Sequence, residues 1–234
     1  MNGMSEASQL TAPQHLGLIL DGNRRWAKAH NLPTLEGHRK GYENLKTITR
    51  AAHKYGVKFV SAYVFSTENW NRSKEEVEYL MKLLLWVSKN EIKQLDKENV
   101  RVVFAGTRER LSDEIITAID KAQERTKNNT AGTLLLCLNY GGHEEIVSAA
   151  NRALSGGAEK LTEDLIEQNL YAADIPPIDL IIRSSGEQRI SNFMLWRAAY
   201  SELYFTPKMW PDFDEADLEV AFQDYARRQR RFGA

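Results

Sequence analysis

Short apolar runs alternate with longer amphipathic stretches along nearly the whole chain. The short runs, which are rich in valine, isoleucine, leucine and phenylalanine, predict six β-strands at Leu16–Leu20, Val57–Phe65, Val100–Ala105, Thr133–Asn139, Ile178–Arg183 and Leu203–Phe205. The longer stretches predict helices at Gly41–Tyr55, Lys74–Glu98, Asp113–Lys127, Glu144–Leu154, Glu163–Leu170, Ser191–Ala199 and Asp214–Arg231. Strict alternation of strand and helix predicts an α/β fold with a mostly parallel sheet covered by helices.

The length and composition are those of one globular domain. The chain has 234 residues, and we expect residues 1–14 to form a flexible N-terminal arm and residues 15–234 a single domain. Neither a signal peptide nor a membrane-spanning run is visible, and the one cysteine cannot form an internal disulfide, which together favour a cytoplasmic protein. A net charge of −1 argues against nucleic acid or another polyanion as a general partner.

Polar side chains gather where the predicted strands end. In a parallel sheet these ends share one edge, and ligands bind there. The segments that follow four of the strands carry acids, amides, glycines and arginines: Asp21–Trp26, Ser66–Arg72, Asn139–His143 and Ser184–Arg189. Arginine forks and glycine turns suit phosphate oxygens, and a lone carboxylate beside phosphates, here Asp21, commonly binds Mg²⁺. The edge therefore predicts a site for Mg²⁺ and for more than one phosphate group.

Simpler interpretations exist for each residue taken alone. Any single arginine could form a surface ion pair, and Asp21 could cap a helix. Several other sites lack their motifs: the chain has neither a Walker loop, nor Gly-x-Gly-x-x-Gly, nor a Gly-x-Ser-x-Gly nucleophile elbow, and its histidines lack zinc-ligand spacing. The clustering at strand ends is what favours the phosphate site.

The predicted helix over Lys74–Glu98 is unusually apolar. Ser73 and Glu76 form a capping box that marks its start, and seven of the eight residues from Leu80 to Val87 are apolar. An amphipathic helix buries only one stripe, so this helix is either covered on all sides, in a core or a dimer, or one wall of an apolar channel. A channel behind an anion site would suit an isoprenoid diphosphate.

Several long motifs in fixed order resemble those of one enzyme family. They are Asp21–Ala27, Phe65–Arg72, Asn139–Gly142, Arg183–Glu187 and Ser201–Phe205. From His15 to Phe232 the chain is similar to the cis-prenyltransferases of the undecaprenyl diphosphate synthase type, and it lacks the Asp-Asp-x-x-Asp motif of trans-prenyltransferases. The resemblance implies a single domain whose six-stranded, mostly parallel sheet and flanking helices enclose a hydrophobic tunnel, in a homodimer. It implies that isopentenyl diphosphate units are condensed onto an allylic diphosphate such as farnesyl diphosphate, with Mg²⁺, giving a cis-polyprenyl diphosphate and diphosphate.

The resemblance also implies roles for individual residues. Asp21 matches the catalytic Mg²⁺-binding acid, and Glu202 matches a second Mg²⁺ ligand. Asn69 matches the residue often given as proton acceptor; because a neutral amide is a very weak base, we expect Asn69 to orient groups while the departing diphosphate takes the proton. The remaining matches bind substrate: Gly22, Asn23, Arg24, Arg25, His38 and Arg72 at the allylic diphosphate, Phe65 and Trp70 near the reacting chain, and Arg183, Arg189 and Ser191 at isopentenyl diphosphate. Trp26, Ser66, Thr67, Glu68 and Ile190 are expected to bind substrate as well.

Three positions depart from the family pattern. Gln188 stands where a histidine is common, Thr34 where a basic residue is common, and Ser184 where threonine or glycine is common. None of the three is Asp21 or Glu202, so we expect an active enzyme.

The same motifs distinguish some alternative functions from a long-chain synthase. A short- or medium-chain cis-prenyl diphosphate synthase would share every motif, and the primer and product length stay open. A Mg²⁺-dependent phosphohydrolase would need an aspartate where Asn23 stands, and a non-catalytic subunit of a heteromeric prenyltransferase would lack the Asp21–Asn23 block. The arginines at 227, 228, 230 and 231 suit the helix dipole, the active site of a dimer or transient contact with the inner membrane face better than nucleic acid.

Overall fold

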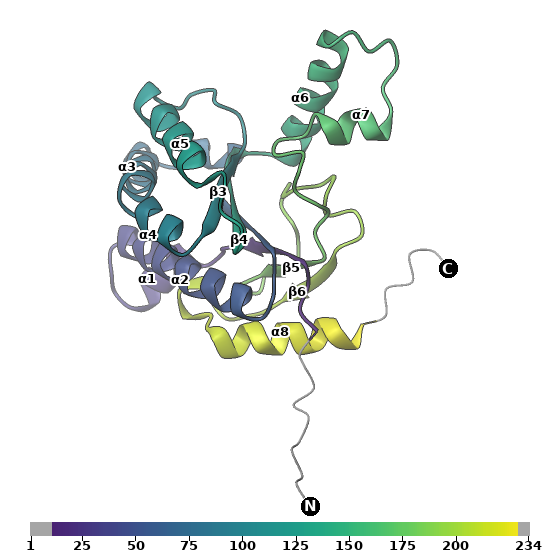
Figure 1. Ribbon diagram of the computed structural model, residues 1–234. Helices are drawn as coiled ribbons and strands as arrows, with labels where there is room; N and C mark the ends of the chain where they lie inside the picture. The colour runs from purple at the N-terminus through teal and green to yellow at the C-terminus, as the bar shows by residue number, and fades with distance from the viewer. Residues whose placement is uncertain (1–10, 229–234) are drawn as a thin grey trace, which may run out of the picture.

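Six parallel strands form one sheet at the centre of the molecule (Figure 1). The computed structural model describes residues 11–228, so Arg230 and Arg231 of the arginine cluster lie outside the described residues. The strands are β1 (His15–Ile19), β2 (Phe59–Ser66), β3 (Val100–Ala105), β4 (Gly132–Tyr140), β5 (Leu180–Arg183) and β6 (Glu202–Phe205), in the order β3-β4-β2-β1-β5-β6. All five pairings are parallel, which confirms the predicted α/β sheet.

Helices occupy most of the predicted intervals. They are α1 (Asn23–Ala29), α2 (Thr34–Lys54), α3 (Lys74–Asn90), α4 (Ile92–Lys97), α5 (Asp113–Thr126), α6 (Gly142–Ser155), α7 (Glu163–Gln168) and α8 (Glu215–Arg227), with 3₁₀ turns η1 (Thr67–Asn71) and η2 (Trp210–Asp212). Three predictions were wrong: α2 begins seven residues before the predicted Gly41, the predicted helix over Lys74–Glu98 is divided at Glu91, and the segment Ser191–Ala199 is a series of turns. Within residues 11–228, none of the helices combines the length and the apolar character needed to cross a bilayer.

Two glycines in the first turns of α2 lower helix propensity, and they allow α2 to pack closely against α1. A Cβ placed on Gly37 would lie 2.1 Å from the carbonyl oxygen of Asn23, and one on Gly41 would lie 2.2 Å from the Asn23 side-chain oxygen. Only glycine allows α1 and α2 to approach this closely. The contact positions Asn23, which begins α1 directly after the end of β1.

The segment Ser191–Ala199 cannot be helical because its first residues have left-handed backbone angles. φ is +49° at Ser191, +65° at Asn192 and +41° at Met194. In exchange, the Ser191 hydroxyl lies 2.7 Å from the Arg183 guanidinium, and the Asn192 side-chain oxygen accepts a hydrogen bond from the backbone N–H of His143. The turns therefore connect the loop after β5 to the loop after β4.

The two faces of the sheet are covered differently. Alternate residues of a strand point to opposite faces, so Leu16 and Leu18 pack into a cluster with residues of α2 and α8, whereas Ile19 packs with Phe193 of the irregular segment 184–201, between β5 and β6. Figure 1 shows α1 to α5 on one side of the sheet and α8 below it, with α6 and α7 projecting at the upper right.

A buried ion pair holds the irregular segment against α6. The Arg197 guanidinium lies 3.0 Å from the Glu145 carboxylate, and the two side chains are 3% and 0% exposed. The same guanidinium donates to the carbonyl oxygens of Tyr171, Ala172 and Ile175. One arginine of the irregular segment thus also holds the turns that follow α7 and precede β5.

Because His15 is fully buried, we expect the free energy of unfolding to fall in acid. Burial lowers the pKa of His15 from 6.5 to about 4, because the charged ring would lose its hydration. The unfolded chain therefore binds the proton first, and stability should fall by about 3 kcal/mol as pH decreases from 6.5 to 4. Urea unfolding across this range should show a shallower decline for His15→Gln, and an unchanged decline for His30→Gln, whose ring is exposed. An equal decline for His15→Gln and the unaltered chain would contradict the assignment.

Candidate active site

The carboxyl ends of four neighbouring strands meet at one edge of the sheet, as predicted. The order β4-β2-β1-β5 is contiguous and parallel, so Tyr140, Ser66, Ile19 and Arg183 end their strands side by side. Asp21 stands two residues beyond β1, near the middle of this row.

Asp21 is held firmly and its carboxylate is 29% exposed. One carboxylate oxygen lies 2.9 Å from the Arg183 guanidinium, and the other lies 3.5 Å from that of Arg25. The Asp21 carbonyl oxygen accepts hydrogen bonds from the Ser184 hydroxyl and from the backbone N–H of Trp210. Gly22, with φ of +102°, occupies the N-cap of α1, so the alternative that Asp21 caps this helix is wrong. The Asp21 carboxylate therefore interacts with the Arg183 and Arg25 guanidinium groups and not with the start of α1.

Two polar pockets flank Asp21 and share it. The first is lined by the start of α1 and α2 and contains Gly22, Asn23, Arg24, Arg25, Lys28, Thr34, His38 and Arg72. The second is lined by the ends of β2 and β5 and contains Ser66, Glu68, Asn69, Arg72, His143, Arg183, Ser191 and Asn192. The structure therefore divides the predicted phosphate ligands into two groups, with Asp21 and Arg72 common to both.

A buried carboxylate organises the cations of the first pocket. Glu76 is 7% exposed, and its carboxylate lies 2.9 Å from Arg72, 3.1 Å from His38 and 3.8 Å from Arg24. Burial lowers the pKa of His38, although the hydrogen bond to Glu76 acts in the opposite direction. The His38 ring is accordingly neutral near pH 7, so of the three groups around Glu76 only Arg24 and Arg72 carry positive charge.

The η1 turn contributes Glu68 and Asn69 to the second pocket. The Asn69 side-chain oxygen accepts a hydrogen bond from the backbone N–H of Ser66 at 3.0 Å, which closes a capping box. Trp70 donates to the Asn139 side chain at 2.7 Å and packs edge-on against Phe65. Since its oxygen is engaged by the backbone, Asn69 is fixed in orientation and is a poor proton acceptor.

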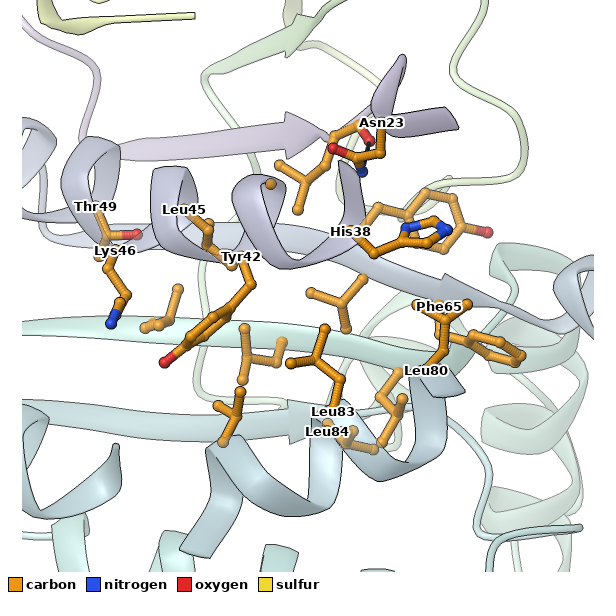
Figure 2. Close-up of a pocket in the computed structure, with 18 of the residues that line it drawn as sticks. Asn23, His38, Tyr42, Leu45, Lys46, Thr49, Phe65, Leu80, Leu83 and Leu84 are labelled. Carbon is orange, nitrogen blue, oxygen red and sulfur yellow. Dashed lines mark hydrogen bonds between the residues drawn. The ribbon is translucent and has the colours of Figure 1, made fainter. Parts of the chain in front are cut away.

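An apolar cavity lies behind the two pockets (Figure 2). Its walls come from α2, α3 and strands β2 and β4, and they include Leu45, Leu80, Met81, Leu83, Leu84, Leu134, Leu136 and Leu138. Leu20 and Arg72 line the cavity and both polar pockets. Most of the apolar residues of α3 are only half-buried, and Trp86 is exposed, so within one chain α3 is a wall of the cavity and is not covered on all sides.

Some predicted site residues lie away from the pockets. The Trp26 indole donates to Asp212 at 2.7 Å, Arg189 pairs with Glu187, and Ile190 packs against the second core cluster. Thr67 lies beside Gly141 in the adjoining loop. These residues border the site without lining either pocket.

Glu202 is not brought to Asp21 within one chain. It opens β6 opposite Leu180, whereas Arg183 ends β5 at the edge that carries Asp21. Three residues of parallel strand separate the two levels, roughly 10 Å, and the Glu202 carboxylate pairs with Arg228 at 2.9 Å. Among the residues that the structure describes, no three His, Cys, Asp or Glu side chains cluster as metal ligands do. Asp21 and Glu202 of one chain therefore cannot hold a single ion.

Further polar residues at the pockets were given no role by the sequence prediction, although His143 lay in the predicted segment Asn139–His143. They include Lys28, Tyr63, Glu76, His143 and Asn192. Lys28 could have been found, because it lies one helical turn after Arg24 on α1. Glu76 was taken only as a capping residue, and Asn192 was placed inside a helix.

A family model matches residues 19–233 of the chain, and its description is "Putative undecaprenyl diphosphate synthase". The chain belongs to this family of prenyltransferases. An isoprenyl transferase of Thermotoga maritima is 45% identical over 225 residues, which cover 94% of this chain and 97% of the relative. An isoprenyl transferase of Clostridium perfringens is 46% identical, with 94% and 90% covered. The protein is thus an enzyme that transfers prenyl groups.

Solved structures of related proteins share the fold. A lavandulyl diphosphate synthase from Lavandula x intermedia, in complex with dimethylallyl diphosphate, has a TM-score of 0.91 and 36% identity over 95% of this chain and 99% of that one. A probable undecaprenyl diphosphate synthase of Campylobacter jejuni has a TM-score of 0.82 and 28% identity, with 96% and 100% covered. The resemblance inferred from the motifs is confirmed at the level of family and fold.

Proposed function

We propose that this prenyltransferase condenses isopentenyl diphosphate with an allylic diphosphate and builds a cis-polyprenyl diphosphate. One observation carries the proposal: Asp21 lines two polar pockets, each with arginines, and both pockets share Leu20 and Arg72 with one apolar cavity. Two diphosphates and one hydrocarbon tail would fill this arrangement. The related structure that binds dimethylallyl diphosphate, itself an allylic diphosphate, supports the choice of substrate class.

In this proposal the first pocket holds the allylic diphosphate. The reaction breaks the allylic C–O bond and leaves diphosphate with the bonding electron pair, so negative charge grows on the leaving group. Arg24, Arg25 and the backbone N–H groups that begin α1 would stabilise that charge because they are already in place. The apolar cavity would hold the tail and exclude the water that could trap the allylic cation.

The second pocket would hold isopentenyl diphosphate. The double bond of this substrate attacks the allylic carbon, a new C–C bond forms, and a proton leaves C2 of the added unit. Arg183, fixed by Ser191 and Asp21, would bind its diphosphate. The departing diphosphate accepts the proton, and Asn69 positions the neighbouring groups.

Asp21 also fits a Mg²⁺ ion. Mg²⁺ prefers oxygen ligands and is commonly bound by one or two carboxylates together with substrate phosphates, which agrees with a single carboxylate between two phosphate pockets. When bound, the ion would supply positive charge to the diphosphate oxygens. The residue that would hold it in this chain is Asp21.

The proposal is tested by supplying both substrates. The protein with Mg²⁺ and labelled isopentenyl diphosphate should form prenyl products from geranyl, farnesyl or geranylgeranyl diphosphate, and product length then distinguishes a short- or medium-chain synthase from a long-chain one. Excess chelator should remove activity, and added Mg²⁺ should restore it. Absence of any product with every primer would refute the proposal.

Asn69 offers a test of the proton acceptor. Asn69→Ala should lower kcat by about 10²-fold, because η1 loses its capping box and the second pocket loses its shape. Asn69→Asp should be no more active than Asn69→Ala if the residue only orients groups. Recovery of turnover in Asn69→Asp above that of Asn69→Ala would show that a base is required at this position.

We also propose a homodimer with transient membrane contact. Val147 and Leu154 of α6 are 59% and 49% exposed and would be covered in a dimer, and Arg227 at the end of α8 is 75% exposed and could face anionic lipid. Light scattering should give twice the mass of 26.7 kDa. A monomer at micromolar concentration would argue against the dimer.

A further inference from the structure

The end of the apolar cavity that lies farthest from Asp21 is polar. It is lined by five polar residues of α2, which are Tyr42, Lys46, Thr49, Arg50 and His53, and by Glu98. We call these six residues the polar end. Residues three and four apart share a helix face, so one side of α2 brings them together. Figure 2 shows Lys46 and Thr49 at the opposite end of the cavity from His38 and Phe65.

Ion pairs connect this part of α2 to the chain around α4. Lys46 lies 3.0 Å from Glu91, between α3 and α4, and its ammonium is 4.9 Å from the centre of the Tyr42 ring. Arg50 lies 2.7 Å from Glu98, directly after α4. Burial and the nearby Glu91 carboxylate raise the pKa of Tyr42 far above its usual value, so its hydroxyl keeps its proton. Charged and hydroxyl groups thus bound a cavity whose middle is hydrocarbon.

Thr49 carries an unmet hydrogen-bonding group into this region. It is 2% exposed, and among the described residues its hydroxyl has no hydrogen-bond partner. Helical threonines often bond to the carbonyl four residues earlier, as the exposed Thr47 does with Glu43. A buried hydroxyl needs a water or a ligand oxygen, and a hydrocarbon tail offers neither.

We propose that the polar end limits product length by its polarity, and not only by the bulk of its side chains. The growing tail fills the apolar section at no penalty, but one more isoprene unit must pack against the unpaired Thr49 hydroxyl and displace water from the two ion pairs. Extension then becomes slower than release. This inference rests on the proposed condensation and adds the physical cause that ends chain elongation.

Threonine and valine have nearly the same shape, which separates polarity from size. Thr49→Val should raise the ratio of products one unit longer to those of the wild-type length by about threefold to tenfold, the factor expected for one desolvated hydroxyl. Thr49→Ser keeps the hydroxyl and should keep the wild-type distribution. Thr47→Val, on the solvent side of the same helix, is the matched control and should also leave it unchanged. Product length is measured with labelled isopentenyl diphosphate and farnesyl diphosphate.

A second variant tests the ion pair. Lys46→Met combined with Glu91→Leu removes both charges together, so neither is left unpaired, and should again lengthen the product. The control is Arg39→Met with Glu43→Leu, an exposed pair on α2 outside the cavity. Thermal unfolding verifies that each variant is folded.

The outcomes separate this inference from the proposed function. If the wild-type chain makes prenyl products and the Thr49→Val and Lys46→Met/Glu91→Leu variants make the same lengths, polarity does not set the limit. If Thr49→Ser lengthens the product as much as Thr49→Val, size decides it. If the wild-type chain makes no product, the condensation itself is wrong.

Discussion

Asp21→Asn is expected to reduce kcat for prenyl transfer by about 10³-fold. The substitution keeps the shape of the side chain but removes the one carboxylate that lines both polar pockets. It removes the proposed Mg²⁺ ligand and leaves the Arg183 and Arg25 guanidinium groups without their shared partner. The diphosphates would then be held less accurately at the moment when charge moves onto the leaving group. Single-turnover rates with saturating substrates would measure the loss.

A matched control separates chemistry from folding. Asp174 is an exposed carboxylate that also pairs with one arginine, Arg101, outside the pockets. Asp174→Asn should retain wild-type turnover, and circular dichroism should show that both variants are folded. If Asp21→Asn kept turnover within threefold of wild type, Asp21 would have no place in the mechanism.

Arg197→Met is expected to lower the free energy of unfolding by about 3–5 kcal/mol. The substitution leaves the Glu145 carboxylate, which is 0% exposed, without its cation and releases three backbone carbonyl groups. The buried Glu145 carboxylate has already lost its hydration on folding, and without Arg197 no cation compensates for that loss. Urea unfolding would measure the change.

Arg152 provides the comparison for this prediction. It also donates to a backbone carbonyl, that of Asn169, but it is exposed, so Arg152→Met should cost less than about 1 kcal/mol. The double variant Arg197→Met/Glu145→Leu should recover part of the loss because no charge remains buried. Equal stabilities for Arg197→Met and Arg152→Met would show that the buried pair contributes little.

The strands could be predicted because their burial requires a short run of apolar residues, which is visible in the local sequence. A parallel strand covered on both faces is apolar at nearly every position, as Val100–Ala105 and the fully buried β4 show. The edge where Asp21, Ser66 and Arg183 meet followed from a rule that holds for any parallel sheet. The family motifs then supplied a role for each residue.

Local patterns failed where distant contacts overrode them. Glycines at 37 and 41 argue against a helix until Asn23 is packed against them. The turns at Ser191 have a helical sequence pattern, yet their side chains bond to Arg183 and to the backbone of His143. Glu202 carries a family motif, but its position along β6 places it away from Asp21.

The amino-acid sequence alone determined the fold class, the family and the edge of the sheet that carries the chemistry, because periodicity and motifs are local properties. Only the tertiary structure decided that Asp21 lies between two separate pockets, that Glu76 gathers three of their side chains, and that the apolar cavity ends in polar groups. Asp21 and Arg183 are 162 positions apart, and such pairs become neighbours only when the strands take their order in the sheet.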